Sequence, residues 1–168
     1  AVTLGGNIVG LTNQVSAAEL DPSAAGPELV FAGYDGRVHC VGSDRRERWS
    51  YAYTTDARVL TAGVAVADLS GDGRPEVILA TYGTQASGHA LLVLGSDGAM
   101  QQRMALPGRG AMAVPTVGDV DGDGALEIVV SLKDDGGDEA LVFTVPGSST
   151  NCVQWPTGRA NWLRNGVP

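Results

Sequence analysis

The stretch GDVDGDGALEIVVS, residues 118–131, places three aspartates at alternate positions and then continues into a β-branched apolar run. It aligns without a gap on ADLSGDGRPEVILA, residues 67–80, at an offset of 51 residues. An acidic, glycine-containing loop that leads into a short apolar segment therefore occurs twice at a fixed spacing. Such internal periodicity indicates a fold built from repeated supersecondary units.

A second element repeats with the same order. VHCVGSD at 38–44 matches LLVLGSD at 91–97, and LVFTVPGS at 141–148 is a looser third copy. Before the first copy, AAELDPSAAGPELVFAGYDG at 17–36 is a degenerate form of the acidic loop, with Glu28 in the place of Glu76. We therefore expect one domain over residues 1–168, made of units at about 7–53, 61–106 and 111–150 and a tail at 151–168.

Each unit has the pattern of short strands. Apolar runs such as EVILAT, ALLVLG and EIVVSL are bounded by Gly, Asp and Ser and are too short for helices. Asp35-Gly36 between two such runs is typical of a tight hairpin turn. Four short strands in about 50 residues form the module of a β-propeller blade. The sequence thus predicts an all-β, propeller-like fold with about three four-stranded blades.

Three blades are too few to close a ring, because propellers typically close with four to eight. We expect an incomplete propeller that is completed by other polypeptide, either a different chain or further copies of this one. Capping of the three blades by the N-terminal strand and the tail is a third arrangement that the sequence leaves open.

The two close-fitting loops have the ligand types that a hard cation prefers. Numbered from the first aspartate, positions 1, 3, 5 and 9 carry side-chain oxygens and position 7 can offer its carbonyl, while a glycine at position 6 permits a sharp turn. The residues are Asp68, Ser70, Asp72, Arg74 and Glu76 in the second unit, and Asp119, Asp121, Asp123, Ala125 and Glu127 in the third. Oxygen ligands without His or Cys favour Ca²⁺ over zinc or copper, so we expect two calcium sites.

An EF-hand is excluded by the residues that follow the loop. It requires a bidentate Glu at position 12 and then a helix. Position 12 is Leu79 or Val130 here, and the continuation is strand-like.

These residues resemble a known family. ADLSGDGRPEVILATYG and GDVDGDGALEIVVSLKD are similar to the FG-GAP/VCBS repeats of integrin-type β-propellers, over about residues 15–150. The resemblance implies a calcium loop of pattern D-x-[DNS]-x-D-G-x-x-[DE] between consecutive blade strands. The tail CVQWPTGRANWLRNG is similar to segments that end such propeller regions, which implies a C-terminal part of a longer propeller.

Three features depart from the pattern of the close-fitting loops or lie outside them. The first loop has Pro22 and one extra residue, and a degenerate metal loop there would use Glu19, Asp21, Ser23 and Glu28. Ser70 removes one charge from the second loop, which predicts weaker binding there. Cys40 and Cys152 form the single intramolecular disulfide that the sequence allows, and pairing is favoured if the protein is secreted.

Composition narrows the functional class. The net charge of −8, with a single lysine, argues against binding to nucleic acid, and no apolar run is long enough for a membrane helix. His39 lies in an apolar strand and His89 has no Ser or Cys nucleophile nearby, so a hydrolase triad is unsupported. Trp49, Tyr51 and Tyr53 stand at alternate positions, which fits packing between blades or a surface that stacks on a sugar or peptide.

The sequence therefore favours a non-enzymatic, calcium-stabilised module for extracellular recognition, adhesion or assembly. We expect it to be secreted or on a cell surface, in an extracellular or periplasmic location, with a carbohydrate or protein as its ligand. The alternatives are part of a carbohydrate-active enzyme that resembles polysaccharide lyases, and a self-assembling filament subunit.

Overall fold

Twelve β-strands and no helix are found in the part of the chain that the computed structural model describes, residues 11–133, 140–149, 153–158 and 160–161. The strands form three antiparallel sheets. The all-β expectation is therefore confirmed.

The first sheet contains four strands in sequence order, β1 (Leu11–Ala18), β2 (Glu28–Gly33), β3 (Arg37–Val41) and β4 (Glu47–Ala52). The turn between β2 and β3 has the expected chemistry, since Gly36 adopts a φ of 79° and the Asp35 carboxylate accepts the Arg37 N–H at 3.1 Å. An Asp-Gly pair thus sets the hairpin, as the sequence predicts.

The second sheet repeats this order with β5 (Val59–Ala67), β6 (Glu76–Gly83), β7 (His89–Leu94) and β8 (Met100–Leu106). The third sheet contains β9 (Thr116–Gly118), β10 (Leu126–Ser131) and β11 (Ala140–Val145). Each sheet runs from a first strand outward through hairpins. This meander is the architecture of propeller blades.

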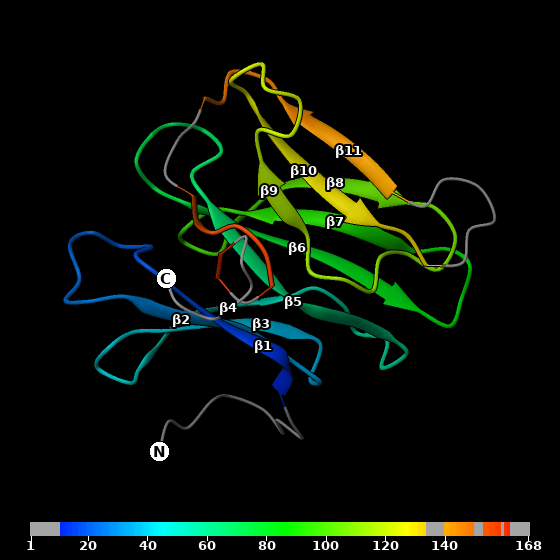
Figure 1. The fold of residues 1–168 in the computed structure, drawn as a ribbon. Coiled ribbons are helices and arrows are strands. Elements are labelled where there is room, and N and C mark those ends of the chain that lie inside the picture. The colour runs from blue at the N-terminus through cyan, green and yellow to red at the C-terminus, as the bar shows by residue number, and fades with distance from the viewer. Residues whose placement is uncertain (1–10, 134–139, 150–152, 159, 162–168) are drawn as a thin grey trace.

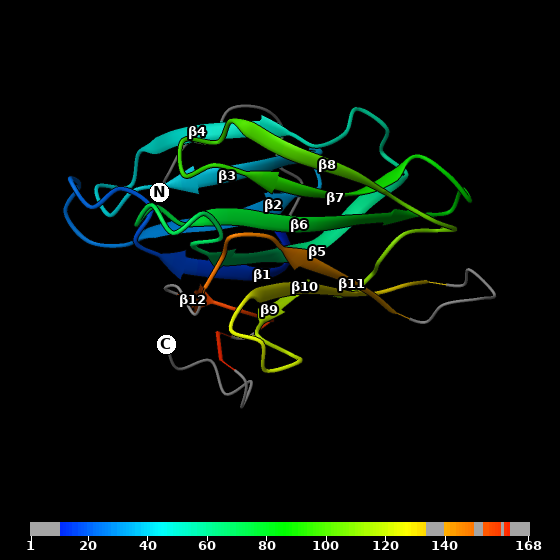
Figure 2. The same cartoon turned by 90° about the horizontal axis from the view of Figure 1, so that it is seen from above.

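The three sheets stack like the blades of a fan, with the second sheet between the other two (Figure 1; Figure 2). Strand alternation supplies both interfaces, because successive side chains of a strand point to opposite faces. One face of the second sheet, with Leu79 and Leu92, packs on the first sheet. Its other face, with Ile78 and Leu91, packs on the third sheet. This two-sided burial explains why β6 and β7 read as continuous apolar runs.

The aromatic residues of β4 belong to the first of these interfaces. Trp49 and Tyr51 pack against the core between the first two sheets, and Tyr53 is 8% exposed within that core. The Trp49 indole N–H donates to the Ser96 carbonyl at 2.8 Å, across the interface. Packing between blades, the first of the two interpretations from sequence, accounts for their positions.

The expected fourth strand of the third blade is not found among the described residues. A short strand after β11, β12 (Val153–Trp155), pairs instead with β5 in the second sheet. The reason lies in what β12 buries there: Trp155 is 8% exposed in the core between the first two sheets. The tail therefore extends the second sheet at its inner edge, and β11 stays at the end of the third sheet.

The tail also contacts the first strand of each sheet. The Val117 N–H of β9 donates to the Pro156 carbonyl at 2.7 Å, and β12 pairs with β5. The side chain of Gln154 binds the backbone of Glu19 twice, accepting from its N–H at 2.6 Å and donating to its carbonyl at 3.2 Å. One segment thus ties the inner edges of three sheets together.

Replacing Gln154 with alanine tests this tie. We expect Gln154→Ala to lower the free energy of unfolding by about 1 kcal/mol, because two hydrogen bonds to backbone groups are lost. Urea unfolding measures the change, and Gln101→Ala on exposed β8 is the matched control. Equal effects of the two substitutions would contradict a stabilising contact between Gln154 of the tail and the first sheet.

Candidate metal centre

The three acidic loops occupy the same place in the three sheets. Each joins the first strand of its sheet to the second: β1 to β2, β5 to β6, and β9 to β10. The loop ligands are therefore presented by short connections between buried strands. A rigid scaffold with functional groups on its loops is a common arrangement for binding sites.

In the third loop, backbone N–H groups hold the Asp119 carboxylate in place. Its Oδ1 accepts from Gly122 at 2.7 Å and its Oδ2 from Gly124 at 3.1 Å. Asp121 Oδ1 accepts from the Asp123 N–H at 3.1 Å. Each carboxylate oxygen has a second lone pair, so these contacts leave acceptor capacity for a cation.

Asp119, Asp121 and Glu127 form a cluster that could hold a metal ion. One ligand oxygen of each lies within 4.8 Å of the others. Glu127 is 1% exposed, its Oε2 accepts the Val120 N–H at 2.9 Å, and its Oε1 has no hydrogen-bond partner. A buried carboxylate oxygen without a donor is costly, and a Ca²⁺ ion would satisfy it. The residues present thus fit the ion that the sequence predicts.

Asp123 and Ala125 do not join this cluster. Asp123 is exposed, and its Oδ1 accepts the Ala125 N–H at 2.8 Å. The same bond occurs in the second loop between Asp72 and the Arg74 N–H, also at 2.8 Å. Position 5 therefore closes the turn in both loops, and its predicted role as a ligand, like that of the carbonyl at position 7, stays a prediction.

The second loop shares the backbone geometry of the third. Asp68 Oδ1 accepts from Gly71 at 2.7 Å, its Oδ2 accepts from Gly73 at 3.0 Å, and Glu76 Oε2 accepts from Leu69 at 2.7 Å. Ser70 stands where the third loop has Asp121, so one carboxylate is missing. Among the described residues, only the third loop brings ligand oxygens of three acidic side chains within 4.8 Å of one another.

Charge in the second loop is concentrated around Glu76. Burial raises the pKa of this carboxyl group, the Leu69 N–H opposes that shift, and the carboxylates of Asp68 and Asp72 add to it. A cation among these groups would replace the repulsion with attraction.

Two glycines per loop, not one, have a left-handed backbone. Gly73 and Gly124 at position 6 have φ of 82° and 91°, as the sequence predicts, and Gly71 and Gly122 at position 4 have φ of 75° and 82°. Any other residue would be strained there. The glycine at position 4 is also visible in the sequence, but the predicted pattern of metal ligands does not include it.

The first loop keeps only part of this design. Glu28 Oε2 accepts the Leu20 N–H at 2.9 Å, which makes Glu28 the structural equivalent of Glu76 and Glu127. Glu19 then precedes Leu20 as Asp68 precedes Leu69, with one residue inserted in the loop. Asp21 accepts from both the N–H and the hydroxyl of Ser23, at 3.0 and 2.5 Å, so these two side chains bind each other. The ability of the first loop to hold a metal ion stays a prediction.

The glutamate at position 9 thus has a structural role that the ligand pattern did not reveal. In all three loops one of its oxygens accepts the N–H of the residue at position 2. The signal for this role was present in the sequence: a glutamate stands at the start of an apolar strand in every unit.

Only one of the two cysteines lies in the part of the chain that the structure describes. Cys40 is buried as a free thiol in β3, and Cys152 lies outside the described residues. The disulfide between them stays a prediction. Separately, the described part of the chain contains no helix of the length and apolarity needed to cross a membrane.

Comparison with family models matches residues 68–130 to a family described as an FG-GAP-like repeat. The match begins at the first aspartate of the second loop and ends within β10, so it includes both close-fitting loops and the strands between them. No curated protein and no solved structure gives a significant match.

Proposed function

From an FG-GAP-like repeat at residues 68–130, carried by a fan of three antiparallel sheets, we propose that the chain is a calcium-stabilised propeller module whose open third sheet receives another polypeptide. The role of this module is extracellular recognition, adhesion or assembly, and it is non-enzymatic. The proposal is supported by the third sheet, whose outer edge and outer face are not covered by any part of the chain that the structure describes.

The outer edge of β11 lacks the features that protect edge strands. The outer strands of the other sheets, β4 and β8, carry charged side chains and pair with register irregularities. The sequence of β11, ALVFTV, has no charge and no proline, and its six-residue register with β10 is continuous. Flat, uncharged edges of this kind pair readily with another strand.

No described segment of the chain covers the outer face of the third sheet either. Leu141 and Phe143 point to the core against the second sheet, so Val142 and Thr144 point away from it. Val142 is 56% exposed, and Thr144 beside it is exposed. In the first two blades the equivalent interface is filled by the next sheet. Another β-rich polypeptide therefore fits here.

The native mass tests whether the completing polypeptide is a second copy. We expect association above 17.2 kDa in light scattering at rising protein concentration, and Val142→Lys should restore the monomer, because a buried unpaired charge disfavours the contact. Leu29→Lys, on the outer face of the first sheet where Leu29 is 44% exposed, is the comparison.

The outcomes separate the arrangements. Loss of association in Val142→Lys alone supports pairing of two third sheets, and loss in both variants supports a filament in which the third sheet of one copy meets the first sheet of the next. A parent chain that is monomeric at all concentrations excludes self-completion and requires a different chain. Activity on polysaccharides in the presence of Ca²⁺ would favour the alternative function, part of a carbohydrate-active enzyme.

A further inference from the structure

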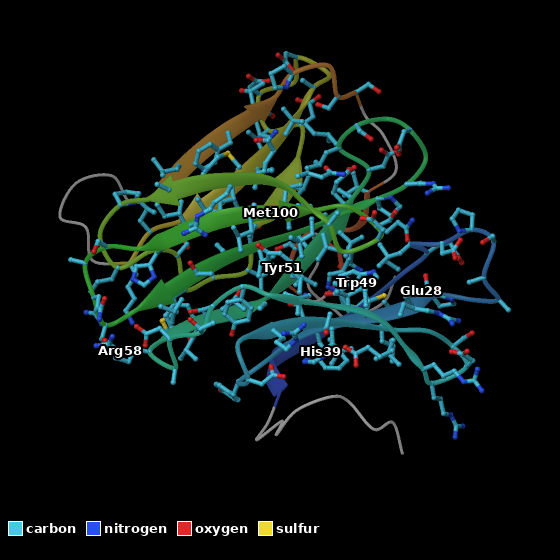
Figure 3. The ribbon with its side chains drawn as sticks, turned by 180° about the vertical axis from the view of Figure 1, so that it is seen from behind. Glu28, His39, Trp49, Tyr51, Arg58 and Met100 are labelled. Atoms are coloured by element: carbon cyan, nitrogen blue, oxygen red, sulfur yellow. The ribbon has the colours of Figure 1, made fainter. Side chains whose placement is uncertain are left out.

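A pocket of about 350 Å³ lies between the first and second sheets, beside the first acidic loop. Glu28 of β2 and Trp49 of β4 line it from the first sheet, and Ser96 and Asp97 line it from the turn between β7 and β8. Figure 3 shows Glu28 and Trp49 where the first sheet meets the second. The pocket is separate from the cluster in the third loop.

Glu28 brings an unsatisfied acceptor to this pocket. The residue is 1% exposed, and its Oε2 accepts the N–H groups of Leu20 at 2.9 Å and Asp21 at 3.3 Å. Its Oε1 is buried and has no partner. A carboxylate oxygen in that state costs free energy unless a donor reaches it. Glu28 is one of the residues that line the pocket, so a donor bound there lies next to this carboxylate.

Glu28 has apolar and neutral neighbours in the pocket lining as well as charged ones. Leu20 and Cys40 lie beside it, and burial, followed by the Glu28 carboxylate, raises the pKa of the Cys40 thiol to about 12. The thiol is therefore neutral at pH 7 and offers no thiolate to a soft metal. The Trp49 ring is held by its hydrogen bond to Ser96, and the Gly98 backbone packs directly against it. A fixed indole can stabilise a neighbouring cation through its π face.

The charges that line the pocket also favour a cation. Three carboxylates, those of Asp21, Glu28 and Asp97, face two guanidinium groups, those of Arg48 and Arg74. Arg48 is already paired with Asp44 at 3.2 Å, outside the lining. The lining thus carries excess negative charge. Glu28 is its most buried carboxylate, and Oε1 of this residue has no hydrogen-bond donor.

We propose that this pocket binds a primary ammonium group on a short alkyl chain, with Glu28 Oε1 as its acceptor and Trp49 beside its stem. An ammonium group is compact and brings three donors, which suits a single buried oxygen. A divalent cation would need six or more oxygens, and the two guanidinium groups in the lining, those of Arg48 and Arg74, would repel it more strongly than a single charge. This inference does not depend on calcium in the other loops or on the completion of the propeller.

Calorimetric titration of the full chain at pH 7 in saturating Ca²⁺ tests the proposal, with n-pentylamine as the probe and n-pentanol as its uncharged analogue. We expect saturable one-to-one binding of the amine and at least about tenfold weaker binding of the alcohol. Glu28→Gln should weaken the amine by about tenfold or more, because it removes the charge and keeps an oxygen for the Leu20 N–H.

Two further variants make the result specific. Asp56→Asn removes one exposed carboxylate, paired with Arg58 outside this pocket, and should bind the amine like the parent chain. Trp49→Phe keeps an aromatic ring without the hydrogen bond to Ser96 and should bind more weakly. It also serves as the second test if Glu28→Gln fails to fold.

A second ligand distinguishes the two possible sources of the ammonium group, a lysine side chain of a partner protein and a free amine. Tighter binding of the blocked peptide acetyl-Gly-Lys-Gly-amide than of pentylamine assigns the pocket to a lysine of a partner protein, and weaker binding assigns it to a free amine. Unchanged affinity in Glu28→Gln, equal binding of pentanol, no binding of pentylamine, or its displacement by additional Ca²⁺ at constant ionic strength would overturn the proposal.

Discussion

Replacing Leu92 with alanine is expected to lower the free energy of unfolding by about 3 kcal/mol. Leu92 lies in the middle of β7, is 0% exposed, and belongs to the core between the first and second sheets. Its register partner in β6 is Leu79, another fully buried side chain of that core. Truncation therefore removes apolar contact from both sheets and leaves a cavity that two rigid sheets cannot collapse to fill.

Urea unfolding monitored by circular dichroism measures this change. Val15→Ala in β1 is the matched control, because it also shortens an aliphatic strand residue but at a position 38% exposed, and it should change the free energy by about 0.5 kcal/mol or less. A Leu92→Ala effect no larger than that of the control would mean that the first two sheets do not pack together in solution.

Removal of calcium is expected to have an effect on stability at least as large as one core truncation. A chelator should lower the melting temperature of the calcium-loaded protein, and Ca²⁺ should restore it more fully than Mg²⁺, which demands a smaller octahedral site. A ligand that binds only the folded state at about 100 times its dissociation constant adds about 2.7 kcal/mol per site. The cluster of Asp119, Asp121 and Glu127 is the strongest candidate for this contribution.

Asp121→Asn separates metal binding from the folding of the loop. The asparagine keeps an oxygen that can accept the Asp123 N–H, so the turn is retained while one ligand charge is lost. We expect Asp121→Asn to reduce the calcium-dependent rise in melting temperature, and Asp21→Asn in the first loop to leave most of it. Equal effects would show that the first loop binds calcium too. A demetallated protein that Ca²⁺ does not stabilise would contradict the calcium proposal.

The candidate site was predictable because its residues are local in sequence. Asp119, Asp121 and Glu127 fall within nine residues, and the shape of a tight loop depends on glycines at Gly122 and Gly124. The orphaned oxygens of Glu28 and Glu127 could not be predicted in the same way. They depend on which donors the surrounding strands bring near, and the sequence does not list those donors in order.

The same distinction between local sequence and long-range packing applies to the fold. The sequence by itself determined the repeat, the short strands and the loop turns, because period-two alternation, Asp-Gly pairs and left-handed glycines act over a few residues. Only the tertiary structure decided that β12 joins β5 instead of completing the third sheet, since that choice depends on where Trp155 is buried. It also decided that Trp49 of one sheet and Ser96 of the next enclose a pocket, because packing between sheets joins residues that no local pattern links.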